Sequence, residues 1–129
     1  IPCYNEAAAI SGVVSAFADA MPQADIFVYD NASTDDTVEI AKKSGAIVCT
    51  EPNKGKGNVV RRMFADIDAD IYVIVDGDGT YDASKCSEMI RRLVDNNLDM
   101  VYMLGEEKIW AEQVRRMAFK ASLNKREHE

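Results

Sequence analysis

Short apolar runs alternate with segments of helical spacing along this chain, and that alternation restricts its fold more than any other feature. The runs that predict strands are residues 1–3, 25–30, 46–50, 71–75 and 99–104. The segments that predict helices are residues 6–21, a short stretch that stops near Gly45, and residues 59–67, 83–97 and 106–125. Strands and helices in this order are typical of βαβ units, in which helices cover a parallel sheet. We therefore predict an α/β fold with an open, mostly parallel sheet and helices on both faces.

Polar residues at the predicted helix ends indicate caps. Asn5 is expected to cap the first helix and Ser33 or Thr34 the second, because their short side chains can accept a hydrogen bond from a free backbone N–H. Gly45 is expected to end the second helix in the left-handed conformation that glycine tolerates best.

The composition indicates one folded domain. With 129 residues the chain can bury a core, and a hydrophobic content of 47% excludes a disordered chain. Fifteen basic and 22 acidic residues leave a net charge of −7. A nucleic-acid partner is not expected, because the phosphate backbone favours a basic protein surface.

Cysteine usage and hydropathy indicate the compartment. Cys3, Cys49 and Cys86 are widely spaced and form no CxxC pair, so neither a disulfide framework nor a zinc site is predicted. No apolar run reaches the ~20 residues that span a bilayer, and no signal peptide opens the chain. We therefore expect a soluble protein of the cytoplasm.

Polar or aromatic residues follow each of the first four predicted strands. These clusters are residues 4–6, 30–34, 53–57 and 76–82. The carboxyl ends of parallel strands share one edge of an open sheet, and ligands bind in the crevice there. The sequence therefore predicts that all four clusters contribute to one site.

Asp76 and Asp78 are the strongest candidates for a metal site. They follow the run 71–75, and in an extended chain the two-residue period puts both carboxylates on the same side. Gly77 and Gly79 permit a sharp turn and the close approach of a ligand. Such a pair suits Mg²⁺ or Mn²⁺, because a hard cation bound by few carboxylates keeps positions open for phosphate oxygens. The alternative interpretation is an ordinary polar turn at the end of a strand.

Other residues of these clusters suit a nucleoside diphosphate. Asp30 offers acceptors to the N–H and O–H donors of a base or ribose, and Tyr4 can stack on the base. Lys54 or Lys56 can pair with a phosphate, which the neighbouring glycines allow to approach the backbone. A cation on the two aspartates would then stabilise charge on a leaving diphosphate. Each residue taken singly also has a plainer explanation, in packing or in an ordinary loop.

Four motifs, in this order and spacing, resemble those of the family 2 glycosyltransferases, which have the GT-A fold. They are IPCYNE at residues 1–6, VYDNASTDDT at 28–37, NKGKGN at 53–58 and VDGDGTYD at 75–82. The branch that transfers mannose or glucose to polyprenyl (dolichyl) phosphate is the most similar. Four ordered motifs are much more specific than any one of them. The resemblance implies that residues 1–104 form the nucleotide-binding, Rossmann-like half of a GT-A fold.

The resemblance also implies roles for individual residues. The nucleotide-binding residues that it implies are Pro2, Tyr4, Glu6 and Asp30. Lys54 is added to them because its charge can pair with a phosphate. Asp76 and Asp78 would bind Mg²⁺ or Mn²⁺ together with the donor diphosphate and so act in catalysis. The implied reaction transfers a sugar from a UDP- or GDP-linked donor to an acceptor such as a polyprenyl phosphate, at the cytoplasmic face of a membrane.

The resemblance ends after Leu104. Family members are longer, and their second half supplies the acceptor site and, in many of them, a carboxylate base. Residues 105–129 instead predict a C-terminal amphipathic helix, in which Arg115 and Arg116 are the late candidates for contact with an acceptor phosphate. The chain is therefore expected to be truncated at both ends, with donor binding better supported than turnover. An apolar terminal helix would also suit a homodimer.

Two other functions remain open at this point. DGDGT at residues 76–80 also resembles the first motif of haloacid dehalogenase phosphatases, with Asp76 as the nucleophile and Asp78 as the general acid/base. That family places the motif on its first strand, whereas three strand–helix units precede it here. The other alternative is a non-catalytic nucleotide-binding fragment or scaffold. A P-loop kinase built on residues 54–58 is disfavoured, because the spaced glycines and the Lys-Ser/Thr pair are missing.

Overall fold

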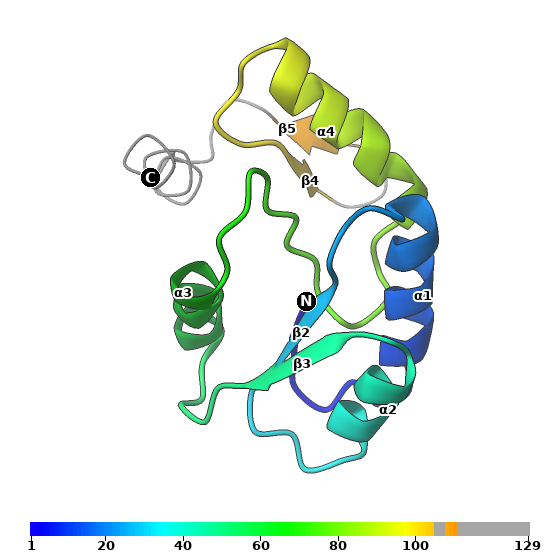
Figure 1. Cartoon of the computed structure of the whole chain (residues 1–129), viewed down its shortest axis with the longest axis vertical. Helices are drawn as coiled ribbons and strands as arrows, with labels where there is room; N and C mark the ends of the chain where they lie inside the picture. The colour runs from blue at the N-terminus through cyan, green and yellow to red at the C-terminus, as the bar shows by residue number, and fades with distance from the viewer. Residues whose placement is uncertain (105–107, 111–129) are drawn as a thin grey trace.

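The computed structural model describes residues 1–104 and 108–110, and its centre is a three-stranded parallel sheet (Figure 1). The strands are β1 (Pro2–Cys3), β2 (Phe27–Asp30) and β3 (Ile47–Thr50), in the order β1-β2-β3. Pro2 lies opposite Tyr29, and Phe27 lies opposite Ile47. The predicted parallel sheet is therefore confirmed.

Helices cover both faces of this sheet, as predicted. The covering helices are α1 (Ile10–Ala20), α2 (Thr37–Lys43) and α3 (Lys56–Asp66). A further helix, α4 (Cys86–Asp95), comes directly after a 3₁₀ turn, η1 (Ala83–Lys85). α1 and α2 lie on one side of the sheet and α3 on the other (Figure 1). α1 and α2 connect strands that follow one another in one direction across the sheet, whereas α3 leaves from the edge strand β3. Right-handed connections place the helices on opposite faces when the direction reverses.

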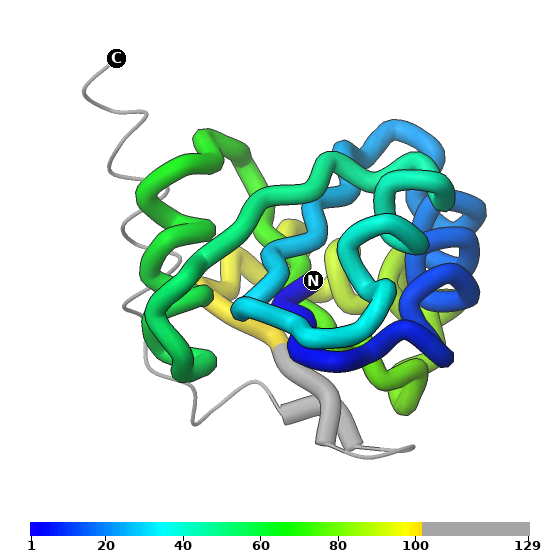
Figure 2. Tube along the Cα trace, turned by 90° about the horizontal axis from the view of Figure 1, so that it is seen from below, coloured from blue at the N-terminus to red at the C-terminus, as the bar shows by residue number. Residues whose placement is uncertain are grey.

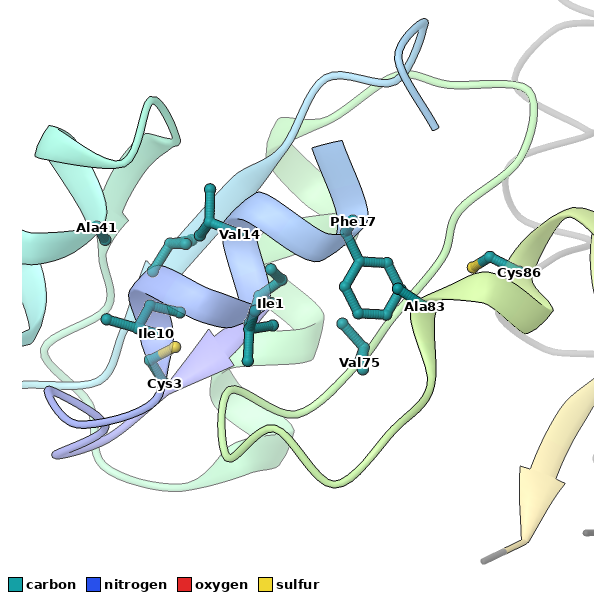
Figure 3. Packing of buried hydrophobic residues seen from close by; sticks show 11 residues of the cluster. Ile1, Cys3, Ile10, Val14, Phe17, Ala41, Val75, Ala83 and Cys86 are labelled. Carbon is teal, nitrogen blue, oxygen red and sulfur yellow. The ribbon is translucent and has the colours of Figure 1, made fainter. Parts of the chain in front are cut away.

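Neighbouring residues of β2 belong to two separate hydrophobic clusters. Val28 packs with Ile10 and Phe17 of α1, in a cluster that we call the α1-side cluster and that Figure 3 shows from close by. Tyr29 packs with Val59 of α3 on the other face. Because successive side chains of a strand point to opposite faces, β2 is buried on both sides and forms the centre of the fold.

Residues 71–75 do not form the predicted strand. Val75 packs into the α1-side cluster near β1 (Figure 3), but the segment joins no ladder among the described residues. Val73 and Ile74 are 37% and 42% exposed. A ladder needs hydrogen-bonding groups on the neighbouring strand. β1 has two residues, and Pro2 has no N–H to donate, so β1 offers little for a further strand to pair with.

The predicted fifth strand and C-terminal helix are also corrected. β4 (Tyr102–Leu104) covers only the end of residues 99–104, and it pairs antiparallel with β5 (Lys108–Trp110) in a separate two-stranded sheet. β5 lies within residues 106–125, so the predicted helix is wrong there. Its sequence KIW combines a β-branched and an aromatic residue, which suit a strand as well as a buried helix face. The remainder of the predicted helix lies outside the described residues.

The helices keep their predicted apolar faces but differ at their ends. α1 begins at Ile10 rather than at residue 6, because residues 6–9 form a turn. Asn5 is not its cap, since it precedes that turn and adopts a left-handed φ of 51°. α3 begins at Lys56 rather than at residue 59. Gly45 follows α2 with a φ of 96°, as predicted.

Candidate functional site

The loops after β1 and β2 run side by side at the carboxyl edge of the sheet (Figure 2). Asn5 N donates to Ser33 Oγ at 2.8 Å, and Asn5 Oδ1 accepts from Thr34 N at 2.8 Å. Glu6 N donates to Thr37 Oγ1 at 2.9 Å. Ser33 and Thr34, which were expected to cap a helix, therefore bind the neighbouring loop, and α2 starts later, at Thr37.

Asp35 adds a further link between these loops. Its Oδ2 accepts from Ala7 N at 3.2 Å, and its Oδ1 accepts from Thr37 N at 3.0 Å and from the Thr37 hydroxyl. These hydrogen bonds, led by the one from the Thr37 hydroxyl, lower the pKa of Asp35 below its ordinary value. The carboxylate is therefore ionised at neutral pH and joins the loop after β1 to the start of α2.

Asp30, the last residue of β2, keeps one acceptor atom without a partner. The residue is 2% exposed, and its Oδ2 accepts from Ser33 N at 3.0 Å. Its Oδ1 is buried and has no hydrogen-bond partner among the described residues. Leaving such an atom unpaired costs about 1–3 kcal/mol, and more for a charged group. Oδ1 of Asp30 therefore marks a place where the N–H or O–H of a ligand would be favourable.

Asn31 joins the end of β2 to the loop after β3. It is buried, and its Nδ2 donates to the carbonyls of Glu51 and Asn53 at 2.8 and 2.9 Å. Its Oδ1 accepts from Gly55 N at 2.9 Å. Gly55 has a φ of 129°, which other residues rarely adopt. One side chain thus holds both ends of the loop 51–55 in place.

Tyr4 and Lys54 meet at the surface of the same edge. Nζ of Lys54 lies 5.3 Å from the centroid of the Tyr4 ring, within the ~6 Å range of a cation–π interaction. Tyr4 is 47% exposed, which leaves part of its ring accessible. The residue predicted to stack on a base and the one predicted to pair with a phosphate are therefore neighbours.

Lys56 joins the loop after β3 to the first aspartate of the pair. Its Nζ donates to Oδ1 of Asp76 in an ion pair. The side chains of Lys56 and Asp76 are 62% and 36% exposed, so water reaches both partners. Lys56, and not Lys54, is therefore the cation that lies at the carboxylate pair in the structure.

Gly77 brings the turn between the two aspartates directly against the loop after β1. A Cβ at this position would lie 2.6 Å from Sγ of Cys3 and 3.4 Å from Cγ of Glu6. Real Cβ atoms do not approach other atoms so closely, and glycine is required for that reason. Glu6 is thereby placed next to Gly77, which lies between Asp76 and Asp78.

The structure thus gathers the predicted residues along one edge of the sheet. Contacts join Tyr4 to Lys54, Lys56 to Asp76, and Glu6 to the position of Gly77. Asp30 lies at the end of β2 between the loops, and Pro2 is buried in β1. These positions agree with a common site, and the ligand-binding role of each residue stays a prediction.

An apolar cavity of about 220 Å³ lies elsewhere, between residues 71–75 and α4. Phe17, Met89 and Leu93 contribute to its lining, and none of the residues predicted to bind nucleotide or metal does so. The segment 71–75, which belongs to no strand, lines this cavity together with residues of α4. We interpret the cavity as a consequence of this packing rather than as the ligand site.

Comparison with known proteins decides the family. A sequence model described as Glycosyl transferase family 2 matches residues 1–127. The chain belongs to glycosyltransferase family 2. Protein RfbJ of Shigella flexneri is 59% identical to this family 2 chain over 107 residues, which cover 83% of each protein. Glycosyltransferase AglJ of Haloferax volcanii is 40% identical over 95 residues, which cover 73% of this chain and 31% of AglJ.

Solved structures support the same family and fold. Glucosyl-3-phosphoglycerate synthase from Mycobacterium tuberculosis, crystallised with Mn²⁺, UDP and phosphoglyceric acid, matches this family 2 chain with a TM-score of 0.64 and 28% identity. The match covers 71% of this chain and 36% of the synthase. The chain therefore spans about a third of the length of AglJ and of the synthase, in contrast to RfbJ. The predicted resemblance to family 2 is confirmed, and the phosphatase alternative is rejected.

The chemistry of Asp76 and Asp78 in this family 2 glycosyltransferase is compatible with a divalent cation, and their role as its ligands stays a prediction. Oδ1 of Asp78 accepts from Thr80 Oγ1 at 2.7 Å and from Thr80 N at 3.0 Å. These bonds, and to a smaller extent the charge of Lys56, lower the pKa of Asp78, so the carboxylate is ionised. Asp76 already binds an ammonium group, which shows that a cation is accommodated there. In the part of the chain that the structure describes, no group of three His, Cys, Asp or Glu side chains could hold a metal, so phosphate and water would supply the other ligands.

Sequence reasoning missed the residues that hold this family 2 site together. Asn31, Asn5 and Thr37 connect the loops through side-chain hydrogen bonds. Asn5 and Asn31 lie in the predicted clusters 4–6 and 30–34, but their role in holding the loops together was not predicted. The available signal for Asn31 was its position directly after a buried strand, because a buried amide needs hydrogen-bond partners from several chain segments. The pairing of Lys56 with Asp76 had no such signal, since Lys54 stands in the same loop.

Proposed function

We propose that this chain binds a nucleoside diphosphate sugar together with Mg²⁺ or Mn²⁺, and that it forms the donor-binding part of an enzyme that transfers the sugar to an acceptor. The observation that carries this proposal is the buried Oδ1 of Asp30, which has no partner among the described residues and lies on the same edge of the sheet as Asp76 and Asp78. A nucleoside supplies the N–H and O–H donors that such an oxygen needs.

The nucleoside end of the donor would bind near β2. Asp30 would accept hydrogen bonds from the base or ribose, and Tyr4 would stack on the base. Lys54, which lies beside the Tyr4 ring, would pair with a phosphate. Structures of the M. tuberculosis synthase contain UDP with Mn²⁺ or Mg²⁺, and UDP-glucose with Mn²⁺ and phosphoglyceric acid. These complexes favour a UDP-linked donor over a GDP-linked one.

Asp76 and Asp78 would hold the divalent cation. When bound, such an ion acts as a Lewis acid that neutralises negative charge on the diphosphate. The chain contributes an ionised Asp78, which the hydrogen bonds from Thr80 keep in one orientation, and an Asp76 that already binds a positive charge. Gly77, which lies between the two aspartates, keeps this turn close to Cys3 of β1 and to Glu6.

For the acceptor we propose a polyprenyl phosphate at the cytoplasmic face of a membrane. The four motifs that resemble the polyprenyl-phosphate branch support this choice. A phosphate oxygen is already nucleophilic, so its reaction with the sugar does not require a carboxylate base. Within the residues that the structure describes, no helix is long and apolar enough to cross a membrane. A homodimer formed through residues 105–129 stays a prediction.

Calorimetric titration tests the donor proposal. UDP, UDP-glucose, GDP and GDP-mannose would each be titrated with and without Mn²⁺. We expect at least one of them to bind in a metal-dependent way. Asp78→Ala should abolish the metal-dependent part, and Asp30→Asn, which replaces an acceptor with a donor, should weaken binding at least about ten-fold.

Asp19→Ala is the matched control for these variants. Asp19 is an exposed aspartate in the last turns of α1, away from the edge where the loops after β1 and β2 meet, so its loss should leave binding unchanged. Absence of binding for all four ligands would favour the non-catalytic scaffold. Metal-independent binding that survives Asp78→Ala would instead contradict the assignment of the carboxylate pair.

A further inference from the structure

Lys56 holds a particular place in the structure. It is the first residue of α3, and the loop before it is fixed by the hydrogen bond from Gly55 N to Asn31 Oδ1 at 2.9 Å. From this fixed start its ammonium group reaches Oδ1 of Asp76. The fold therefore fixes the backbone position of the lysine that meets the carboxylate pair, while its exposed side chain can still move.

The ion pair between Lys56 and Asp76 competes with a divalent cation. An ammonium group that donates to Oδ1 of Asp76 occupies an oxygen that a metal would use, and its positive charge repels a second cation at the same carboxylate. Both partners are accessible to water, so the pair is weak enough to be exchanged.

We propose that Lys56 is an internal counterion of the carboxylate pair, so that Mg²⁺ or Mn²⁺ enters together with the nucleoside diphosphate and binds poorly before it. The diphosphate brings an alternative anionic partner for the ammonium group of Lys56. Once Lys56 has moved to a phosphate, both oxygens of Asp76 are available to the metal. Lys56 is thus a positioning residue that couples the binding of the two ligands, and the inference rests on the donor-binding function proposed above.

Lys54 is a matched control within the same loop. It carries the same charge two residues earlier, and its ammonium lies over the Tyr4 ring at 5.3 Å from the centroid. Removing either lysine changes the net charge of the chain by the same amount. A difference between Lys56→Ala and Lys54→Ala therefore reports the contact with Asp76 and not the general electrostatic field.

The test measures Mn²⁺ binding without and with nucleotide, by calorimetry or by the electron paramagnetic resonance signal of free Mn²⁺. Without nucleotide, Lys56→Ala should bind Mn²⁺ about two- to five-fold more tightly than Lys54→Ala, the range that an exposed ion pair allows. Saturating UDP should increase Mn²⁺ affinity in the wild type, and clearly less in Lys56→Ala, because the coupling between two ligands is lost with the group that links them. Lys54→Ala serves as the control only without nucleotide, because Lys54 is itself proposed to bind a phosphate.

The outcomes separate this inference from the donor proposal. Equal Mn²⁺ affinities of Lys56→Ala and Lys54→Ala without nucleotide would overturn the counterion role, even if the wild type binds UDP with Mn²⁺. Tighter Mn²⁺ binding by Lys56→Ala in a protein that binds no nucleotide would support the counterion role and reject the donor proposal. Failure of the wild type and both variants to bind Mn²⁺ at all would overturn the counterion role together with the metal site.

Discussion

Replacement of Gly77 with alanine tests the contact that brings the two aspartates against β1. The added Cβ would lie 2.6 Å from Sγ of Cys3 and 3.4 Å from Cγ of Glu6, whereas carbon atoms in contact are most stable at ~3.5–4.0 Å. Cys3 is 3% exposed and belongs to β1, so its sulfur has no solvent to move into. The turn must therefore shift, and Asp76 and Asp78 must shift with it.

The magnitude follows from the packing of this site. Forcing an extra methyl group into a close-packed site costs about 1–3 kcal/mol of unfolding free energy. The control is Gly57→Ala in α3, where an added Cβ meets no atom within 4 Å. In Gly57→Ala the alanine lowers the conformational entropy of the unfolded chain, so this variant should be more stable than the wild type by about 0.5–1 kcal/mol. Urea or guanidinium unfolding curves measure both variants against the wild type.

A double variant isolates the responsible contact. Cys3→Ala removes the sulfur atom, so Cys3→Ala/Gly77→Ala should be at least about 1 kcal/mol more stable than the sum of the two single effects predicts. If the single effects simply add, or if Gly77→Ala unfolds at the same denaturant concentration as the wild type, the turn does not lie against β1. Glu6 would then not lie next to the turn that carries the two aspartates.

Two further outcomes are expected. Asn31→Ala removes three hydrogen bonds to residues 51–55, so the unfolding free energy should fall by about 1.5–4 kcal/mol. The control is Asn58→Ala, which removes one exposed hydrogen bond to the Lys54 carbonyl. Equal losses of unfolding free energy in the two variants would contradict the role of Asn31. Burial raises the pKa of Cys3 to about 12, so the folded protein keeps a proton that the unfolded chain loses above about pH 9. The unfolding free energy should therefore fall as the pH rises from about 9 to about 12. Unfolding curves recorded at several pH values in this range should show a smaller fall of the unfolding free energy for Cys3→Ala than for the wild type. Identical pH profiles of the two proteins would count against the burial of this thiol.

The order of elements and the place of the site follow from local patterns. Ile10, Val14 and Phe17 recur at helical spacing, and all three are buried in the α1-side cluster. Asp30 follows a run of apolar residues, and it lies at the end of β2. Such patterns are reliable because a helix or strand that presents one apolar face must bury it, whatever the rest of the chain does.

Pairing of strands depends on the partner as well as on the strand. The run 71–75 indicates an extended, partly buried segment, and Val75 is indeed buried. A ladder also needs N–H and C=O groups on the neighbour, and β1 offers two residues, one of them Pro2. β5 is a similar case, because its three residues form a strand only through their register with β4. Neither outcome can be read from the residues of the segment itself.

The two lysines of the loop after β3 show how far residue types alone can place a site. Lys54 and Lys56 have the same chemistry and either can pair with a phosphate, and Lys54 is the one predicted to bind nucleotide. Gly55 between them has a φ of 129°, and α3 starts directly after it, so the chain changes direction. One ammonium group then lies over Tyr4 and the other on Asp76. The loop thus links the predicted nucleoside end of the site to its metal end, and Asn31, which binds the loop, positions both at once.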